Sequence, residues 1–208
     1  MQPQVRIPSG ELKYGVRRHL WCCRPAVFVL LAVLAVPPTS LGALLGLRLS
    51  ENVHVVVPGL AYRSAQLWPD ELELVIADYG IRSIVSLVPP EPEQSWYQGG
   101  ILVSSSHQIA RYELPLSPHV RPTSDQLRDL LFLMQEAPKP ILIHSRSGAD
   151  RTGLAAAMFQ YAIASRPAGE AGRQLSIRYG HFPSVWWDTS VMDATFQEFV
   201  ATGRPSTP

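Results

Sequence analysis

The chain has 208 residues, which is enough for one domain with a hydrophobic core and an additional segment. Its 18 Lys and Arg residues almost balance its 17 Asp and Glu residues, and the net charge of +1 argues against nucleic acid as a partner. The two cysteines, Cys22 and Cys23, are adjacent and therefore give no disulfide framework. We expect unmodified thiols there, with palmitoylation as the alternative.

The amino-terminal part of the sequence predicts a membrane anchor. Residues 1–24 are rich in Lys and Arg, and no charged residue occurs from residue 25 to residue 47, a length close to the ~20 residues that span a bilayer. We expect a basic cytoplasmic amino terminus over 1–24 and a transmembrane signal anchor over 25–48, with the domain of this single-pass protein on the outer (periplasmic or extracytoplasmic) side. The stretch AVFVLLAVLAV also fits a secretory signal, so a cleaved and secreted protein is the alternative.

The remaining residues, 51–202, predict one domain that begins with alternating strands and helices. Residues 51–67 suggest two short extended pieces around a Pro-Gly turn. A helix is predicted over 69–80, because Pro69 and acidic residues open it and Gly80 ends it. The elements expected next are a buried strand over 81–88, an irregular excursion with room for one short element over 89–108, and a strand over 110–116.

The second half of the domain continues the alternation. Thr123 and Gln126 form a capping box at the start of a helix over 123–137, whose apolar face contains Leu127, Leu130, Leu131 and Met134. The elements expected next are a strand over 139–145, an alanine-rich helix over 151–165, helices within 167–179 and 189–200, and a disordered tail over 203–208. This order predicts an α/β domain of three layers with a mainly parallel central sheet.

The segment HSRSGADRTG, residues 144–153, has the features of a phosphate-binding loop. A strand runs directly into a loop and a helix amino terminus, where unpaired backbone N–H groups and the helix dipole favour a dianion. Gly148 allows a turn tight enough to aim successive amides inward. Arg151, six residues after Ser145, can return its planar guanidinium to two phosphate oxygens. The first glycine and the lysine of the nucleotide-binding P-loop are absent.

These residues resemble the signature His-Cys-x5-Arg-[Ser/Thr]-Gly of the cysteine-dependent protein phosphatases, the tyrosine and dual-specificity group. His144, Arg151, Thr152 and Gly153 match, and Ser145 stands where the cysteine belongs. The resemblance covers most of the predicted domain and is nearest to bacterial dual-specificity-like phosphatases with one membrane segment. It implies the protein-tyrosine-phosphatase-like fold and hydrolysis of phosphomonoesters without a metal or other cofactor. The residues that it places around the substrate phosphate are Arg146, Ser147, Gly148, Ala149, Asp150 and Arg151.

Ser145 changes the chemistry that the resemblance implies. A cysteine at this helix terminus attacks phosphorus as a thiolate, whereas a serine hydroxyl stays protonated and the sequence places no base beside it. His144 is expected to brace the loop rather than act as that base. We therefore expect phosphate binding to survive and hydrolysis to be nearly lost. A natural serine and an introduced Cys→Ser replacement both fit the sequence.

Hydrolysis also needs a general acid for the leaving oxygen. Asp125 is the acid nearest to the usual loop, but we expect it to lie solvated in the first turn of the helix that starts after Thr123. Asp150 is the better candidate, because it resembles the acid that some phosphatases carry inside the loop; a loop-holding role is its alternative. The candidate catalytic residues are therefore Ser145, Asp150, Arg151 and Thr152, with the Thr152 hydroxyl facing position 145.

Several other conspicuous residues are given structural roles. Arg63 is expected to have a structural bracing role, with a contact to the phosphate loop as the alternative. His181 and Phe182 are expected to pack the carboxy-terminal helices onto the domain. Trp186 and Trp187 are expected in the core, with a membrane interface or a substrate rim as the alternative. The histidines whose spacing gives no convincing metal site are His54, His107 and His119.

The sequence as a whole predicts a membrane-anchored member of the tyrosine and dual-specificity phosphatase family. Its partner would be a phosphorylated protein or a small phosphomonoester, and its hydrolysis would be impaired by Ser145. The alternative is a pseudophosphatase, which binds phosphorylated ligands without turnover. A purely structural domain is a third interpretation, which the presence of both Gly148 and Arg151 disfavours.

Overall fold

The computed structural model describes residues 51–182 and 190–202 of the chain. The segments expected over 1–24 and 25–48, the residues Trp186 and Trp187, and the tail over 203–208 lie outside the described residues. Within the described ranges, no helix has both the length and the apolar character needed to cross a bilayer.

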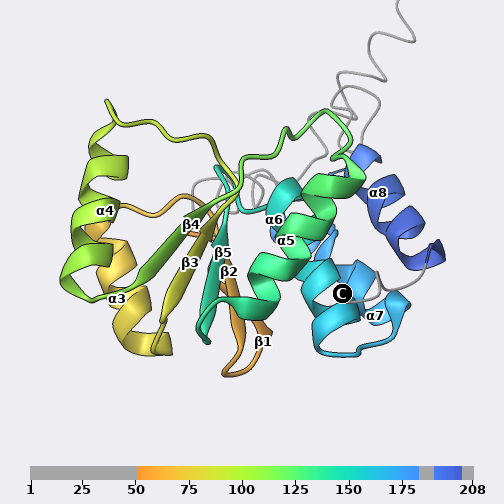
Figure 1. The fold of residues 1–208 in the computed structure, drawn as a ribbon, viewed down its shortest axis with the longest axis horizontal. Helices are drawn as coiled ribbons and strands as arrows, with labels where there is room; N and C mark the ends of the chain where they lie inside the picture. Colours follow the sequence, from red (N-terminus) through yellow and green to blue (C-terminus); the bar gives the residue numbers. More distant parts are fainter. Residues whose placement is uncertain (1–50, 183–189, 203–208) are drawn as a thin grey trace, which may run out of the picture. The chain divides into compact units, whose positions relative to one another are not determined.

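Five strands form one mixed sheet in the order β1-β2-β5-β3-β4 (Figure 1). Strands β1 and β2 form an antiparallel hairpin, and the other three neighbouring pairs are parallel, as the sequence predicted. Ser64, His144 and Ser86 lie at the same level in the register, so three strands end together at one edge of the sheet. The bounds of the strands are β1 His54–Val57, β2 Ala61–Ser64, β3 Ser83–Ser86, β4 Ala110–Glu113 and β5 Ile141–His144.

Helices cover both faces of this sheet, which confirms the predicted three layers. Along β5, Ile141 and Ile143 pack in one hydrophobic core and Leu142 packs in the other, because successive side chains of a strand point to opposite faces. Figure 1 shows two helices on the Leu142 side, α3 (Pro69–Tyr79) and α4 (Ser95–Ser106). The helices on the other side are α5 (Ser124–Glu136), α6 (Asp150–Met158) and, packed beside α6, α8 (Ser190–Ala201).

Local sequence signals account for the start of α5. The Thr123 hydroxyl accepts a hydrogen bond from the Gln126 N–H at 3.2 Å, and the Gln126 side chain accepts one from the Thr123 N–H at 3.0 Å. This reciprocal pair is the predicted capping box. Asp125 lies exposed in the first helical turn, where its carboxylate is 2.7 Å from the Arg128 guanidinium. Its predicted position in the first turn is thus confirmed.

The prediction for residues 89–108 was wrong in extent, because twelve of these residues form the helix α4. Two adjacent glycines and a run of serines give the segment a low helix propensity. A Cβ at Gly99 would lie 2.3 Å from Pro69 Cγ, so the glycine serves the close packing of α4 on the start of α3. Tertiary packing, which the sequence pattern does not display, therefore decides this element.

The prediction of a helix within 167–179 was also wrong in the form of the element. Only one α-helical turn forms, α7 (Ala168–Ala171), followed by two short 3-10 turns, η2 (Gly172–Gln174) and η3 (Ile177–Tyr179). The backbone carbonyl of Gln174 accepts a hydrogen bond from Arg63 instead of continuing a helix. The preceding helix, predicted over 151–165, forms as α6 and continues as the π-helical segment η1 (Phe159–Ile163).

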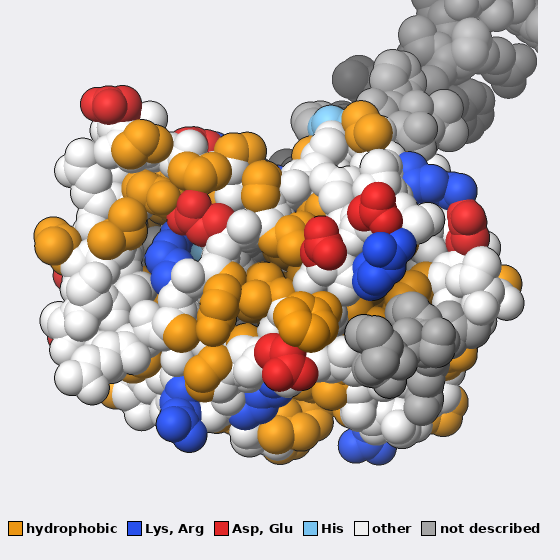
Figure 2. Space-filling model, in the orientation of Figure 1, with side chains coloured by type: hydrophobic (Ala, Val, Ile, Leu, Met, Phe, Trp, Pro, Cys, Tyr) orange, Lys and Arg blue, Asp and Glu red, His pale blue; other side chains and the backbone are white. Residues whose placement is uncertain are grey.

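Charged side chains are interspersed on the face of the described residues drawn in Figure 2. Lys and Arg side chains lie among Asp and Glu side chains there, and hydrophobic side chains separate them. On this face, charges of the two signs are therefore mixed rather than separated into two opposed charged surfaces.

Candidate active site

The candidate site is the loop 145–149 between β5 and α6. It starts at the edge where β2, β5 and β3 end together and leads directly into the amino terminus of α6. Parallel α/β sheets bind their ligands at the carboxyl ends of the strands. The structure thus places the predicted loop at the position in the fold that is best suited to a ligand.

Gly148 determines the tight curvature of this loop. Its φ of +68° lies in the left-handed region, which residues with a Cβ rarely adopt. A Cβ there would lie 2.6 Å from the Ala65 nitrogen and 2.7 Å from the Ser64 carbonyl oxygen, both of them backbone atoms at the end of β2. The loop consequently packs against β2 only because position 148 has no side chain.

Four consecutive carbonyl groups of the loop point into the surrounding protein. Those of Arg146 and Ser147 accept hydrogen bonds from the Gln66 N–H (3.3 Å) and the Asn52 side chain (3.1 Å). Those of Gly148 and Ala149 accept hydrogen bonds from the Arg63 guanidinium. Within residues 51–182 and 190–202, the N–H groups of Ser147, Gly148, Asp150 and Arg151 donate to no other group. These donors and the amino terminus of α6 together form a concentration of positive potential.

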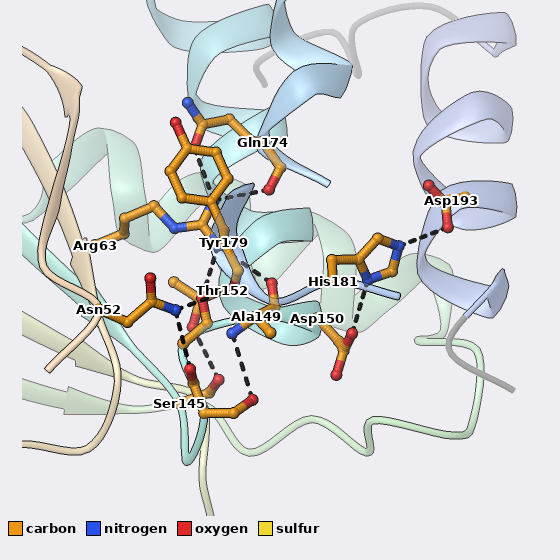
Figure 3. Close-up of polar contacts among 12 residues, drawn as sticks. Asn52, Arg63, Ser145, Ala149, Asp150, Thr152, Gln174, Tyr179, His181 and Asp193 are labelled. Atoms are coloured by element: carbon orange, nitrogen blue, oxygen red, sulfur yellow. Dashed lines mark hydrogen bonds and ion pairs between the residues drawn. The ribbon is translucent and has the colours of Figure 1, made fainter. Parts of the chain in front are cut away.

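Arg63 is the central support of the loop, and its predicted bracing role is confirmed (Figure 3). Its side chain is fully buried and donates to Gly148 at 2.7 Å, to Ala149 at 3.2 Å, and to the backbone and side-chain oxygens of Gln174 at 2.8 Å each. The Tyr179 ring centroid lies 4.1 Å from the guanidinium carbon, in a cation–π arrangement. Burial lowers the pKa of Arg63 to about 10, against the opposing effect of Tyr179 and Asp150, so the side chain remains charged at neutral pH.

Asn52 is a second support, which the sequence analysis missed. Its side-chain amide donates to the carbonyls of Ser147 at 3.1 Å and Tyr179 at 3.0 Å, and so links the loop to η3. His54 Nε2 lies 3.0 Å from the Asn52 side-chain oxygen and orients the amide. No local pattern could have identified Asn52, because its partners are 95 and 127 residues away along the chain.

The Arg151 guanidinium is held at the site by two backbone carbonyls. Its Nη1 donates to Leu87 at 3.2 Å and to Leu116 at 3.3 Å, beyond the ends of β3 and β4. Burial lowers the pKa of Arg151, Asp150 counteracts this effect, and the side chain is almost completely enclosed. A guanidinium fixed along one edge retains further N–H groups for a bidentate contact with an oxyanion.

Ser145 is buried, with only 1% of its surface exposed, and Thr152 Oγ1 donates a hydrogen bond to Ser145 Oγ at 2.9 Å. The predicted orientation of the Thr152 hydroxyl toward position 145 is therefore confirmed. Burial lowers the pKa of His144 to about 3, aided by the positive charges of Arg111 and Arg151. His144 is neutral, but it forms no hydrogen bond with Ser145; among the described side chains, only Thr152 does.

The side chains of Arg146 and Ser147 complete the loop. The exposed Arg146 guanidinium forms an ion pair with Glu91 from the segment after β3. The Ser147 hydroxyl accepts a hydrogen bond from the Ala149 N–H at 3.4 Å. All the predicted phosphate-binding positions, 146–151, thus lie in one loop and helix start, and Glu91 is the neighbouring residue that the sequence analysis missed.

Asp150 lies in the first turn of α6 and is bound by His181 (Figure 3). His181 Nδ1 lies 2.7 Å from Asp150 Oδ1, and His181 Nε2 lies 2.7 Å from Asp193 Oδ2 on α8. The ring is completely buried. Burial lowers the pKa of His181, but the hydrogen bonds to Asp150 and Asp193 and their negative charges outweigh it, so the pKa is raised. His181 therefore connects α8 to the domain, as predicted, and does so by binding a candidate catalytic residue.

The remaining histidines have separate surroundings. His107 lies 3.2 Å from Glu73 at the surface, and the N–H of His119 donates to Ser117 in an exposed turn. In the part of the chain that the structure describes, no group of three or more His, Cys, Asp or Glu residues is arranged to hold a metal ion.

No family model matches the chain, and no curated protein matches it. Solved structures do match. TpbA of Pseudomonas aeruginosa is 21% identical with a TM-score of 0.54, and the match covers 79% of this chain and 88% of that one. The core catalytic domain of the PP-IP phosphatase SIW14 of Saccharomyces cerevisiae is 22% identical with a TM-score of 0.56 (73% and 90% covered). A putative phosphatase (DUF442) of Shewanella putrefaciens is 15% identical with a TM-score of 0.57 (73% and 90% covered). At these identities the likeness establishes the fold, and it confirms the predicted protein-tyrosine-phosphatase-like α/β architecture.

Proposed function

We propose that this chain is a member of the cysteine-dependent phosphatase family that binds phosphomonoesters at the loop 145–151, and that Ser145 strongly impairs their hydrolysis. One observation carries the proposal: the loop turns its carbonyls into the protein, and within the described residues four N–H groups of the loop and helix start are unpaired around a buried hydroxyl, beside the fixed Arg151 guanidinium. A tetrahedral dianion is the ligand that satisfies such a set of donors.

The bound ligand would place its phosphorus atom near Ser145 Oγ. The N–H groups and Arg151 would then stabilise the charge on the transferring oxygens. Phosphoryl transfer requires that the attacking atom lose its proton. A cysteine side chain at this position loses it before the attack and reacts as a thiolate. Ser145 keeps its proton, and no hydrogen bond joins its hydroxyl to His144, which would have to accept it. The expected result is tight binding with slow turnover or none.

A pseudophosphatase is the second candidate function. It is favoured by the Thr152–Ser145 hydrogen bond, which occupies a lone pair of the hydroxyl, and no basic side chain among the described residues is hydrogen-bonded to Ser145. A Cys→Ser variant of TpbA has been crystallised in complex with phosphotyrosine, so a protein of this fold with such a replacement binds a phosphomonoester. The same behaviour is proposed for this chain, with a phosphorylated protein or a small phosphomonoester as the partner.

We further propose that residues 25–48 anchor the protein in a membrane with the domain on the outer side, or act as a cleaved secretory signal. The basic residues of 1–24 and the uncharged run that follows support this placement.

The test compares the full-length chain with its Ser145→Cys variant. Both should bind tungstate, a tetrahedral oxyanion, in calorimetry, and Ser145→Cys should gain hydrolysis of p-nitrophenyl phosphate by orders of magnitude. Arg151→Lys should weaken tungstate binding about tenfold or more, because a lost charge-assisted pair costs ~1.5–3 kcal/mol. Arg166→Lys is the matched control, since Arg166 is exposed and pairs only with Glu170 among the described residues.

Three outcomes separate the candidate functions. Measurable turnover by the Ser145 protein, abolished by Arg151→Lys, would identify a slow phosphatase. Tungstate binding without turnover in the Ser145 protein, with turnover restored by Ser145→Cys, would identify the pseudophosphatase. Failure of the Ser145 protein to bind tungstate would refute both.

A further inference from the structure

Asp150, His181 and Asp193 form a chain of hydrogen bonds that leads from the phosphate loop to α8. Both ring nitrogens of His181 lie 2.7 Å from a carboxylate oxygen, one at the start of α6 and one on α8. The second oxygen of Asp150 has no hydrogen bond within the described ranges, and Figure 3 shows that it points away from His181. The histidine thus fixes one Asp150 oxygen and leaves the other available.

The number of donors in this chain determines its protonation state. A neutral imidazole has a single N–H, whereas an ionised carboxylate only accepts hydrogen bonds. Two carboxylates on the two ring nitrogens therefore require both nitrogens to donate, so the observed arrangement belongs to the imidazolium form of His181. The charged groups that face the ring are Asp150 from α6 and Asp193 from α8, and Asp150 also lies in the field of Arg63 and Arg151.

We propose that His181 is the positioning residue of Asp150: held on α8 by Asp193, it fixes the Asp150 carboxyl group beside the loop so that the free oxygen protonates the leaving group. This inference rests on the proposed function, because it concerns the reaction at the same loop. His181 does not touch the substrate, and it acts through Asp150 alone.

In the Ser145→Cys protein, the thiolate at position 145 forms a bond to phosphorus while the bond from phosphorus to the leaving oxygen breaks. The leaving oxygen takes the electron pair of that bond and the proton that Asp150 carries on Oδ2 in the reactive form, in which Oδ1 still accepts the hydrogen bond from the His181 imidazolium. Asp150 becomes a carboxylate, and the imidazolium that already donates to its Oδ1 stabilises the new charge. The preformed hydrogen bond removes the need to reorganise Asp150 during the step.

The experiment uses the full-length Ser145→Cys protein and two esters, phenyl phosphate and p-nitrophenyl phosphate. Phenolate leaves with more difficulty than p-nitrophenolate and so depends more on an acid. Adding His181→Gln should lower kcat for phenyl phosphate by about 10- to 100-fold, within the range of general acid catalysis, and should change kcat for p-nitrophenyl phosphate much less. Adding Asp150→Asn to the His181→Gln protein should cause no further loss, because both changes remove the same function.

A second variant tests the inference without altering the histidine. Asp193→Asn removes one negative charge beside His181 and so lowers the pKa of His181. The imidazolium that holds Asp150 is then lost at lower pH, and the limb of the kcat profile that falls with rising pH should move to lower pH while the plateau is kept. A residue that only packs α8 would not move this limb. His107→Gln is the matched control, because His107 also pairs with a carboxylate but lies exposed, against Glu73 on α3. It should leave the profile unchanged.

The outcomes separate this inference from the proposed function. Equal losses for the two esters, additive losses with Asp150→Asn, or an unmoved pH limb in a folded Asp193→Asn protein would each overturn the positioning role. Tungstate binding by a Ser145→Cys protein that hydrolyses neither ester would also overturn it, and the binding function would stand. Absence of tungstate binding would overturn both.

Discussion

Replacement of Gly148 by alanine is the most direct test of the loop geometry. The native φ of +68° costs a residue with a Cβ about 1–2 kcal/mol. The new Cβ would lie 2.6–2.7 Å from backbone atoms of Ser64 and Ala65, so the loop or β2 must move, and overpacking of this kind costs about 1–3 kcal/mol. Together these effects should lower the free energy of unfolding by about 2–5 kcal/mol.

The same change should impair the ligand site. Moving the loop away from β2 displaces the Gly148 and Ala149 carbonyls from Arg63, and with them the N–H groups that face the ligand. We expect tungstate affinity to fall at least tenfold, which corresponds to a loss of about 1.4 kcal/mol. Urea denaturation of the full-length chain measures the stability effect, and calorimetry measures the binding.

Gly80→Ala is the control that separates the two contributions. Gly80 has a similar φ of +61°, but no atom lies within 4 Å of the Cβ position. It should therefore show the conformational cost of about 1–2 kcal/mol without the steric cost, and it should bind tungstate normally. If Gly148→Ala proves no more destabilising than Gly80→Ala and keeps its tungstate affinity, the geometric reasoning is refuted.

Further predictions concern Arg63, His181 and the membrane segment. Arg63→Lys should lower the free energy of unfolding by about 2 kcal/mol or more, because one ammonium cannot replace donors to four buried oxygens; the exposed Arg82→Lys should change little in the same urea assay. The raised pKa of His181 means that its contribution to stability is complete below pH 6.5 and is lost as pH rises through the higher folded-state value. The difference in unfolding free energy between the unsubstituted chain and His181→Gln should therefore shrink above pH 6.5, and a constant difference would contradict the ion-pair assignment. Protease added outside intact cells or spheroplasts should remove the domain if residues 25–48 anchor it on the outer side, and protection until lysis would indicate the opposite topology.

Local signals in the sequence were sufficient for the loop and much of the sheet. Seventeen residues contain the run ILIH, a polar loop with Gly148, and Arg151 at the start of an alanine-rich segment. Each of these features acts on its immediate neighbours. The capping box at Thr123 is of the same kind, since both partners lie within one helical turn. Such features can be predicted because the physical cause lies in adjacent residues.

The missed features depend on contacts between distant segments. Asn52 reaches Ser147 across 95 residues, and neither residue has a pattern that singles it out. His181 was expected to pack, but its link to Asp150 requires that η3, the segment after it and the start of α6 be brought together by the fold. The helix α4 likewise depends on Gly99 lying against Pro69. Topology creates these contacts, so the sequence alone could not reveal them.

The supports of the loop also explain why serine at position 145 is compatible with an intact site. Asn52 holds the Ser147 carbonyl, Arg63 holds the Gly148 and Ala149 carbonyls, and the backbone at the end of β2 packs against Gly148. The carbonyls of Leu87 and Leu116 hold Arg151. None of these contacts involves the side chain at position 145. A neutral hydroxyl lacks the thiolate's negative charge, which would repel an incoming dianion, so the same donors can bind phosphate with one repulsion fewer. Under the proposed function, binding and turnover are therefore physically separable in this loop, and the single atom at position 145 would decide between them.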